Sequence, residues 1–291
     1  MKKFLSTTLF GAMLIMACAC TTNARPNAMN GHTPDEDSAE YTLSILVAGD
    51  LMQHQGQINA ASNGNGTYSY EETFRYVKEE VSSADLAIAN FEVTLGGQPY
   101  KGYPCFSAPD EYLAATIDAG FDVLLTANNH CLDSRQKGLE RTIDMMNKAG
   151  VPHLGTYKNK AARDKDYPLL VEKNGFRVVL LNFTYGTNGL KVQAPNVVNY
   201  MDTTEIARDI KKAKSMNPDI IIAMPHWGIE YVLQPNKQQR DIAAWLLRKG
   251  VDHVIGAHPH VLQPMELLNK EKRGGNLVAY SLGNYVSNMA K

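Results

Sequence analysis

Five apolar segments of the chain each end at residues whose side chains can bind a metal ion. These segments are rich in Ile, Val and Leu and are bounded by Gly, Pro or Asn, which is typical of buried β-strands. In open α/β sheets, ligands collect at the carboxyl ends of the strands. The sequence therefore predicts that segments far apart in the chain converge on one site. The residues at the five segment ends are Asp50, Glu92, Asn129 with His130, His226, and His258 with His260.

The pair His258 and His260 is the most specific of these signals. Pro259 between them is expected to hold His258 extended and fixes its own φ, which lowers the entropic cost of presenting two imidazoles. A single carboxylate such as Asp50 also occurs as a helix or turn cap, and a single histidine such as His226 also occurs as a packed core residue. Two rigidly held histidines at one strand end favour a metal site instead.

Apolar extended segments alternate with helical patterns along the chain, and each helical pattern is followed by a strand candidate. This alternation predicts an α/β layered fold. Asn174-Gly175 supplies the positive φ angles of a tight turn, so residues 167–171 and 176–184 are predicted to form a β-hairpin. The sheets should therefore mix parallel and antiparallel pairs. The predicted helices cover residues 70–83, 109–119, 138–149, 203–216 and 237–249.

Composition and charge describe an ordinary globular chain. The 291 residues are 44% hydrophobic, and 29 Lys and Arg stand against 30 Asp and Glu with neither sign concentrated. Such a balance lacks the basic stripe of a nucleic-acid binder, so nucleic acid is not an expected partner.

Cys105 and Cys131 are the only cysteines beyond the leader; a disulfide and two buried free thiols both remain open. Without a CxxC pair, oxygen and imidazole groups are the expected metal ligands.

The N-terminus carries a targeting segment. Lys2 and Lys3 precede an apolar stretch, residues 4–17, that is too short for a comfortable membrane span, and a cysteine follows. Residues 14–18 resemble a bacterial lipoprotein box, which predicts residues 1–20 as a lipoprotein signal peptide and Cys18 as the lipidation site. Cys20 is a second candidate, and ordinary cleavage near Ala19 with release of a secreted protein is the alternative. The polar residues 21–40 are expected to form a flexible tether, and one domain should run from residue 41 to 291.

Six ordered motifs resemble those of CapA-type poly-γ-glutamate capsule biosynthesis proteins, in the calcineurin-like metallophosphatase superfamily. The resemblance runs from about Leu43 to Val286. Single motifs would be weak, but the series in one order is specific. The motifs are Gly49-Asp50, Ala89-Asn90-Phe91-Glu92, Ala127-Asn128-Asn129-His130 with Asp133, His226-Trp227-Gly228 with Glu230, Gly256-Ala257-His258-Pro259-His260 with Gln263, and Ser281-Leu282-Gly283-Asn284-Tyr285.

This resemblance implies a four-layer α/β/β/α sandwich with mixed sheets and two divalent metal ions at the strand ends. The ions would be manganese, iron or zinc. It implies that Asp50 and His260 hold the first ion, that Asn129, His226 and His258 hold the second, and that Glu92 bridges them. His130 would be a general acid rather than a ligand, and Asp133 would orient its imidazole.

The chain departs from the superfamily pattern at two places. Many metallophosphatases carry a histidine two residues after the first aspartate, where this chain has Met52, so the first ion is expected to lack one ligand. His54 is a possible replacement, but an exposed loop histidine is the favoured interpretation. Family members commonly continue past the Ser-Leu-Gly-Asn segment, so the domain ending at Lys291 is expected to be truncated at its C-terminus.

Two functions compete. The leading hypothesis is a lipid-anchored, metal-dependent hydrolase of the cell envelope, facing outside the cytoplasm, that cleaves a phosphoester or amide in an anionic surface polymer or its precursor. The alternative is a non-catalytic factor that binds such a polymer and assists its synthesis or export, together with capsule-synthesis membrane proteins. A structural domain without an ion is the third possibility. Glu230, Arg240 and Lys101 are candidate substrate-side groups.

Overall fold

The computed structural model describes residues 6–10, 13–20, 41–270 and 274–289, with side chains described from residue 41 onward. The predicted tether, residues 21–40, lies outside the described residues. Two strands, β1 (Ser6–Phe10) and β2 (Met13–Cys20), come from the predicted signal peptide, and β2 pairs antiparallel with β3 (Tyr41–Leu51). Cys18 therefore lies in β2 as far as its backbone is described, and its lipidation stays a prediction.

Two mixed sheets form the centre of the molecule. The first has seven strands in the order β1-β2-β3-β4-β5-β6, with β15 paired to β3, and its members from β3 to β6 run parallel. Its remaining strands are β4 (Leu86–Phe91), β5 (Val123–Leu125), β6 (His153–Leu154) and β15 (Asn284–Val286). The second sheet has six strands in the order β13-β14-β12-β11-β9-β8, parallel in the middle and antiparallel at both edges.

The strands of the second sheet are β8 (Leu169–Lys173), β9 (Phe176–Thr184), β11 (Ile220–His226), β12 (His253–Ile255), β13 (Met265–Leu268) and β14 (Asn276–Ala279). A separate antiparallel pair joins β7 (Thr156–Tyr157) to β10 (Val197–Val198). The hairpin predicted from Asn174-Gly175 is confirmed, since β8 and β9 pair across these residues, whose φ angles are 50° and 80°.

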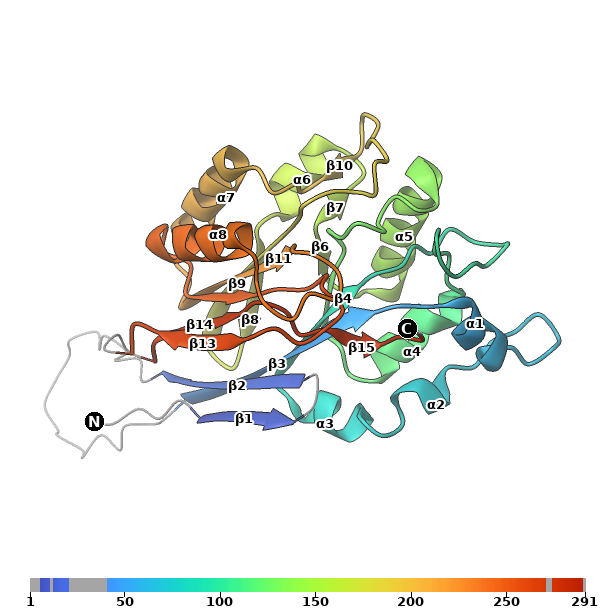
Figure 1. Ribbon diagram of the computed structural model, residues 1–291, viewed down its shortest axis with the longest axis horizontal. Helices are drawn as coiled ribbons and strands as arrows, with labels where there is room; N and C mark the ends of the chain where they lie inside the picture. Colours follow the sequence, from blue (N-terminus) through green and yellow to red (C-terminus); the bar gives the residue numbers. More distant parts are fainter. Residues whose placement is uncertain (1–5, 11–12, 21–40, 271–273, 290–291) are drawn as a thin grey trace, which may run out of the picture.

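Alternation along the strands of the first sheet separates two cores. In β3, Ile45 and Val47 pack toward the second sheet, while Leu46 and Ala48 pack toward helices on the other face. The helices near the first sheet are α1 (Gln55–Ala61), α2 (Glu71–Phe74), α3 (Lys78–Ser83), α4 (Asp110–Asp118) and α5 (Arg135–Ala149). The others are α6 (Lys160–Asp166), α7 (Thr203–Ser215) and α8 (Lys237–Arg248). Figure 1 shows α7 and α8 on the outer side of the second sheet, so the predicted four-layer α/β/β/α sandwich is confirmed.

Some local predictions were wrong. The helix predicted for residues 70–83 is two short helices, α2 and α3, interrupted where Val77 adopts φ −120° and ψ −9°. Aromatic and β-branched residues crowd this stretch and lose side-chain freedom in a helix, which weakens it there. Helix α5 begins three residues before the predicted start, at Arg135.

Cys105 and Cys131 are both free. Within the described part of the chain, none of the helices combines the length and apolar character that crossing a bilayer requires.

Candidate metal centre

All six predicted metal ligands meet where strands of both sheets end. Asp50 is the penultimate residue of β3, Glu92 directly follows β4, and His226 is the last residue of β11. Asn129 lies in the loop after β5, and the two remaining histidines lie in the loop after β12. Every one of these side chains is buried: Asp50, Glu92, Asn129, His226, His258 and His260.

Glycines allow the strands to approach this closely. A Cβ on Gly49 would overlap the carbonyl oxygen of Gly283, which accepts the N–H of Asp50 at 2.9 Å. Likewise, a Cβ on Gly256 would overlap the carbonyl oxygen of Tyr280. The glycines of the Gly-Asp and Gly-Ala-His motifs are therefore required for close backbone packing, and the residues after them supply the ligands.

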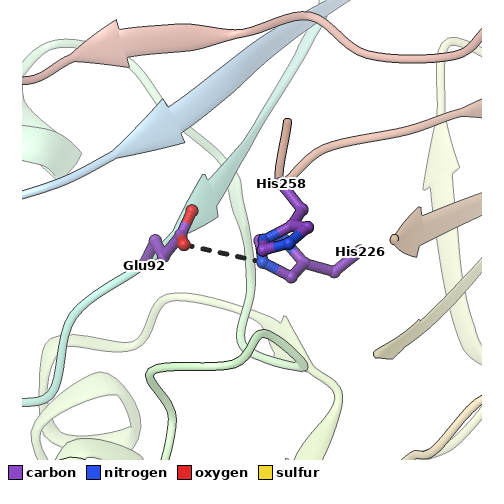
Figure 2. Close-up of side chains that lie close together, drawn as sticks. All are labelled: Glu92, His226 and His258. Carbon is purple, nitrogen blue, oxygen red and sulfur yellow. Dashed lines mark ion pairs between the residues drawn. The ribbon is translucent and has the colours of Figure 1, made fainter. Parts of the chain in front are cut away.

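The ligand atoms form two clusters that share Glu92. Asp50, Glu92 and His260 make one, and Glu92, His226 and His258 make the other, with all ligand atoms of a cluster within 4.8 Å of one another. Figure 2 shows the Glu92 carboxylate facing the imidazoles of His226 and His258. Glu92 Oε1 lies 3.5 Å from His226 Nε2 and 4.0 Å from His260 Nε2. This sharing is the geometry expected of a bridging carboxylate.

Asn129 and Asn284 extend the clusters. Asn129 Oδ1 lies 2.7 Å from His226 Nε2, and its amide donates to Asn188 Oδ1 at 3.2 Å. On the other side, His260 Nδ1 lies 3.2 Å from Asp50 Oδ2 and 2.8 Å from Asn284 Oδ1. Both amides thus contact an imidazole that the family resemblance implies to be a metal ligand.

The residues present fit divalent metal. Three enclosed polar atoms of the ligand residues have no hydrogen-bond partner: Glu92 Oε1, His258 Nδ1 and His260 Nε2. Within the described chain, the ion pairs of Asp50 and Glu92 are made to histidines rather than to Lys or Arg. Buried charges and unpaired polar atoms are costly unless something compensates them. Divalent cations bound by the two clusters would satisfy all three atoms, and carboxylate with imidazole suits manganese, iron or zinc.

The protonation equilibria of the histidines favour metal binding. Burial and then the proximity of His258 hold the pKa of His226 well below its ordinary value. Burial, followed by repulsion from His260, lowers the pKa of His258 to about 4. Both imidazoles are therefore neutral near pH 7, with lone pairs available to a cation.

The two carboxyls behave differently. Burial and then the charge of Asp50 raise the pKa of Glu92 well above its ordinary value. Burial would also raise the pKa of Asp50, but its hydrogen bond with His260 and the charge of that imidazole hold it well below its ordinary value. In the absence of a cation, Asp50 therefore carries the charge more readily than Glu92.

Asn90 contacts three of the candidate ligands, an arrangement that the sequence did not reveal. Its Nδ2 lies 2.7 Å from Asp50 Oδ1, 3.1 Å from Glu92 Oε2 and 3.3 Å from His226 Nδ1. Asn90 precedes Glu92 by two residues, so the two side chains share a face of the extended chain, and this spacing was the available signal. The amide holds both carboxylates in place.

His130 and Asp133 form a separate pair beside the ligands. His130 Nδ1 lies 2.7 Å from Asp133 Oδ2, which also accepts the N–H of Phe106 at 2.7 Å. The edge of the Phe106 ring packs against the imidazole, with centroids 4.6 Å apart. Both members of the pair are buried, and His130 is in neither cluster around Glu92. The carboxylate thus fixes the ring and leaves Nε2 for another contact.

The prediction that Pro259 holds His258 extended was wrong. His258 has φ 99° and His260 has φ 59°, both in the left-handed half of the map. This turn of the loop brings the imidazole of His260 within 3.2 Å of Asp50 Oδ2, and the backbone N–H of His258 within 3.4 Å of the same oxygen. Such backbone costs roughly 1–3 kcal/mol per residue and is concentrated at functional sites.

The residues around the predicted missing ligand are also accounted for. Met52 is buried in the core between the first sheet and its helices. His54 is half-buried, not exposed as expected, because it caps α1. Its Nδ1 accepts the N–H of Asn288 at 3.2 Å and lies 3.3 Å from Gln57 Oε1.

Of the three candidate substrate-side groups, only Glu230 reaches the centre, within 4.8 Å of ligand atoms on His258 and His260. Arg240 lies on α8 beside Glu266, and Lys101 is exposed in the loop after β4.

Two tyrosines that the sequence did not single out line the centre. The Tyr185 ring lies 4.5 Å from the His258 ring, and the Tyr231 ring lies 6.1 Å from the His260 ring. Both are partly exposed, at 43% and 46%. Tyr185 directly follows the apolar strand β9, so the strand-end rule that found the ligands also applies to it.

Comparisons with known proteins show the family to which the chain belongs. Residues 44–289 match the profile of the family described as bacterial capsule synthesis protein PGA_cap. The capsule biosynthesis protein CapA of Bacillus anthracis is 31% identical over 257 residues, which are 84% of this chain and 59% of that protein. The PGA biosynthesis protein CapA of Bacillus subtilis (strain 168) is 30% identical over 259 residues, covering 85% of this chain and 64% of that protein.

Among solved structures, the calcineurin-like phosphoesterase YfkN of Bacillus subtilis superposes with a TM-score of 0.49 at 19% identity, covering 83% of this chain and 82% of YfkN. The chain spans less than two thirds of the length of the two CapA relatives. The match to the family profile nevertheless extends over nearly all of the described fold and includes every residue of the two clusters. The chain belongs to the bacterial capsule synthesis protein family PGA_cap.

Proposed function

We propose that this protein is a metal-dependent hydrolase that acts on an anionic capsule polymer of the poly-γ-glutamate type, or on a precursor of it. The names of the two CapA relatives support the polymer class. One observation carries the catalytic role: the buried His130–Asp133 pair, 2.7 Å apart, stands beside the ligand clusters without being part of them. A site built only to hold a structural ion has no need of such a pair.

Two divalent ions are proposed, with manganese, iron and zinc all compatible with the ligands. Asp50 and His260 would hold one ion, Asn129, His226 and His258 the other, and Glu92 both. When bound, such ions lower the pKa of water and polarise the bond under attack.

The chain's own residues would then do three things. Asn90 holds the carboxylates of Asp50 and Glu92 in position through its amide. The Asp133 carboxylate would accept the Nδ1–H of His130 and so hold the ring in place, and the imidazole in its doubly protonated form would donate its Nε2 proton to the leaving group. The ring of Tyr185 walls the side of His258 and limits the approach of bulk water.

The proposed location is the cell envelope, facing outside the cytoplasm. Lipid attached at Cys18 would anchor the protein to the membrane, and residues 21–40 would give the domain reach toward a nascent polymer. Capsule-synthesis membrane proteins are the proposed partners.

The test uses the full-length chain, purified in detergent, with His130→Gln and a control, His153→Gln, outside the clusters. Both variants and the wild type are assayed for metal content by plasma mass spectrometry. They are then tested against phosphoesters, γ-glutamyl amides and poly-γ-glutamate. We expect His130→Gln to keep its metal and lose turnover by roughly 10²–10⁴-fold, with the control unchanged.

Two outcomes would contradict the proposal. Full turnover in His130→Gln would show that His130 is not the general acid. Metal-dependent polymer binding by the wild type, with no substrate of either class cleaved, would favour the non-catalytic polymer-binding role instead.

A further inference from the structure

Glu230 lies at the open side of the metal centre. Its carboxylate is within 4.8 Å of ligand atoms on both His258 and His260, and it is exposed, whereas Asp50 and Glu92 are fully buried. Glu230 makes no hydrogen bond or ion pair with another described residue. An exposed carboxylate without a protein partner, facing two imidazoles with unpartnered nitrogens, is free to bind a cation.

The backbone holds Glu230 in this place. Gly228, just after β11, has φ 97°, and a Cβ there would come within 2.9 Å of the Gln239 side chain. Beyond Glu230, the N–H of Tyr231 donates to the carbonyl of Pro259 at 2.8 Å. The carbonyl of Val232 accepts from Gln263 Nε2 at 2.7 Å. Residues 228–232 are therefore tied to the same loop that carries the two histidines.

The cluster of Asp50, Glu92 and His260 leaves room for a further ligand. It offers three protein atoms, while transition ions at catalytic sites take four to six ligands, water included. Met52 is enclosed in the core, and the Nδ1 of His54 is engaged by Asn288. Glu230 is a further acidic residue, and its carboxylate lies within 4.8 Å of a ligand atom on one of the three, His260.

We infer that Glu230 is an additional metal ligand, which binds from the rim the ion held by Asp50 and His260 and takes the place of the imidazole absent at Met52. This inference rests on the metal centre of the proposed function. With Glu230 bound, two divalent ions face three carboxylates, so the centre keeps one net positive charge for an anionic substrate. The ligand on the solvent side would also close the coordination shell at the exposed rim of the centre.

Mn²⁺ binding by calorimetry tests this inference on the full-length chain. The variant is Glu230→Gln, which keeps the shape and removes the charge. The matched control is Glu79→Gln, an exposed glutamate on α3. We expect the wild type and the control to bind two ions alike. Glu230→Gln should bind one of them at least roughly 10- to 100-fold more weakly, the scale on which even indirect partners of metal ligands act.

Glu230→Cys separates direct ligation from a field effect. A thiolate prefers soft ions, so this variant should bind Cd²⁺ tightly at the weakened site while its Mn²⁺ affinity stays low. If Glu230→Cys binds neither Mn²⁺ nor Cd²⁺ at the weakened site, and circular dichroism shows an unchanged fold, direct ligation by residue 230 is contradicted.

Failure of the Glu230 assignment and failure of the proposed function give different results. If the wild type binds two Mn²⁺ and Glu230→Gln binds them equally well, the assignment of Glu230 is wrong and the dinuclear centre stands. If the wild type binds no ion at all, both the assignment and the proposed function fall.

Discussion

Replacing Glu92 with glutamine is expected to stabilise the metal-free protein while abolishing its metal binding. Glu92 is fully buried, its Oε1 has no partner, and burial with the charge of Asp50 raises its pKa well above 4.5. A carboxyl whose folded-state pKa is raised favours folding at low pH. That contribution to stability is lost as the pH rises from the pKa of the carboxyl in the unfolded state toward its pKa in the folded state.

The size of the effect follows from this shift. Each unit by which the folded pKa is raised, up to the working pH, costs the folded state about 1.4 kcal/mol. Glutamine has nearly the same shape and no charge, so the variant avoids this cost. A gain of about 1.4 kcal/mol raises the melting temperature of a chain of this size by about 2–4 °C.

Thermal unfolding of both proteins, followed by circular dichroism at pH 4 and pH 7, measures this difference. Without metal, Glu92→Gln should melt higher at pH 7, and the gap should narrow at pH 4, where Glu92 is protonated in the folded state and largely protonated in the unfolded state. With Mn²⁺ at a hundredfold excess over its Kd, the order should reverse, because the wild type gains about 2.7 kcal/mol from binding. A metal-free variant that melts below the wild type at pH 7 would refute this account of Glu92.

Three further changes have specific expected outcomes. Asp133→Asn should keep the metal but lower turnover by roughly tenfold or more, because His130 loses the carboxylate that orients it; equal kcat in both proteins would argue against this role. Tyr185→Ala removes the ring against His258, so KM for polymer should rise about threefold to tenfold through lost contact, as steady-state kinetics would detect. Gly175→Ala, at φ 80°, should cost about 1 kcal/mol of stability in a denaturant titration and leave Mn²⁺ binding untouched; any change in metal affinity would contradict a purely local effect.

Local patterns predicted the positions of the ligands because they depend on near neighbours in the chain. Runs of Ile, Val and Leu ending at Asp50, Glu92 and His226 predicted strands, and β3, β4 and β11 end within a residue of these positions. The order of motifs added the family and the four-layer architecture. Where propensity and packing competed, as in residues 70–83, the sequence pattern was insufficient.

The sequence by itself determined which residue types stand at the strand ends, the hairpin at Asn174-Gly175 and the layered class of the fold. Only the tertiary structure decided that Glu92 is shared by two clusters, that Asn90 holds two carboxylates, and that Glu230 faces the centre from the rim. The physical reason is that strand periodicity and turn chemistry are encoded over a few residues. Distances between ligands instead depend on how two sheets pack and on loops in backbone conformations, such as φ 99° at His258, that local preference disfavours.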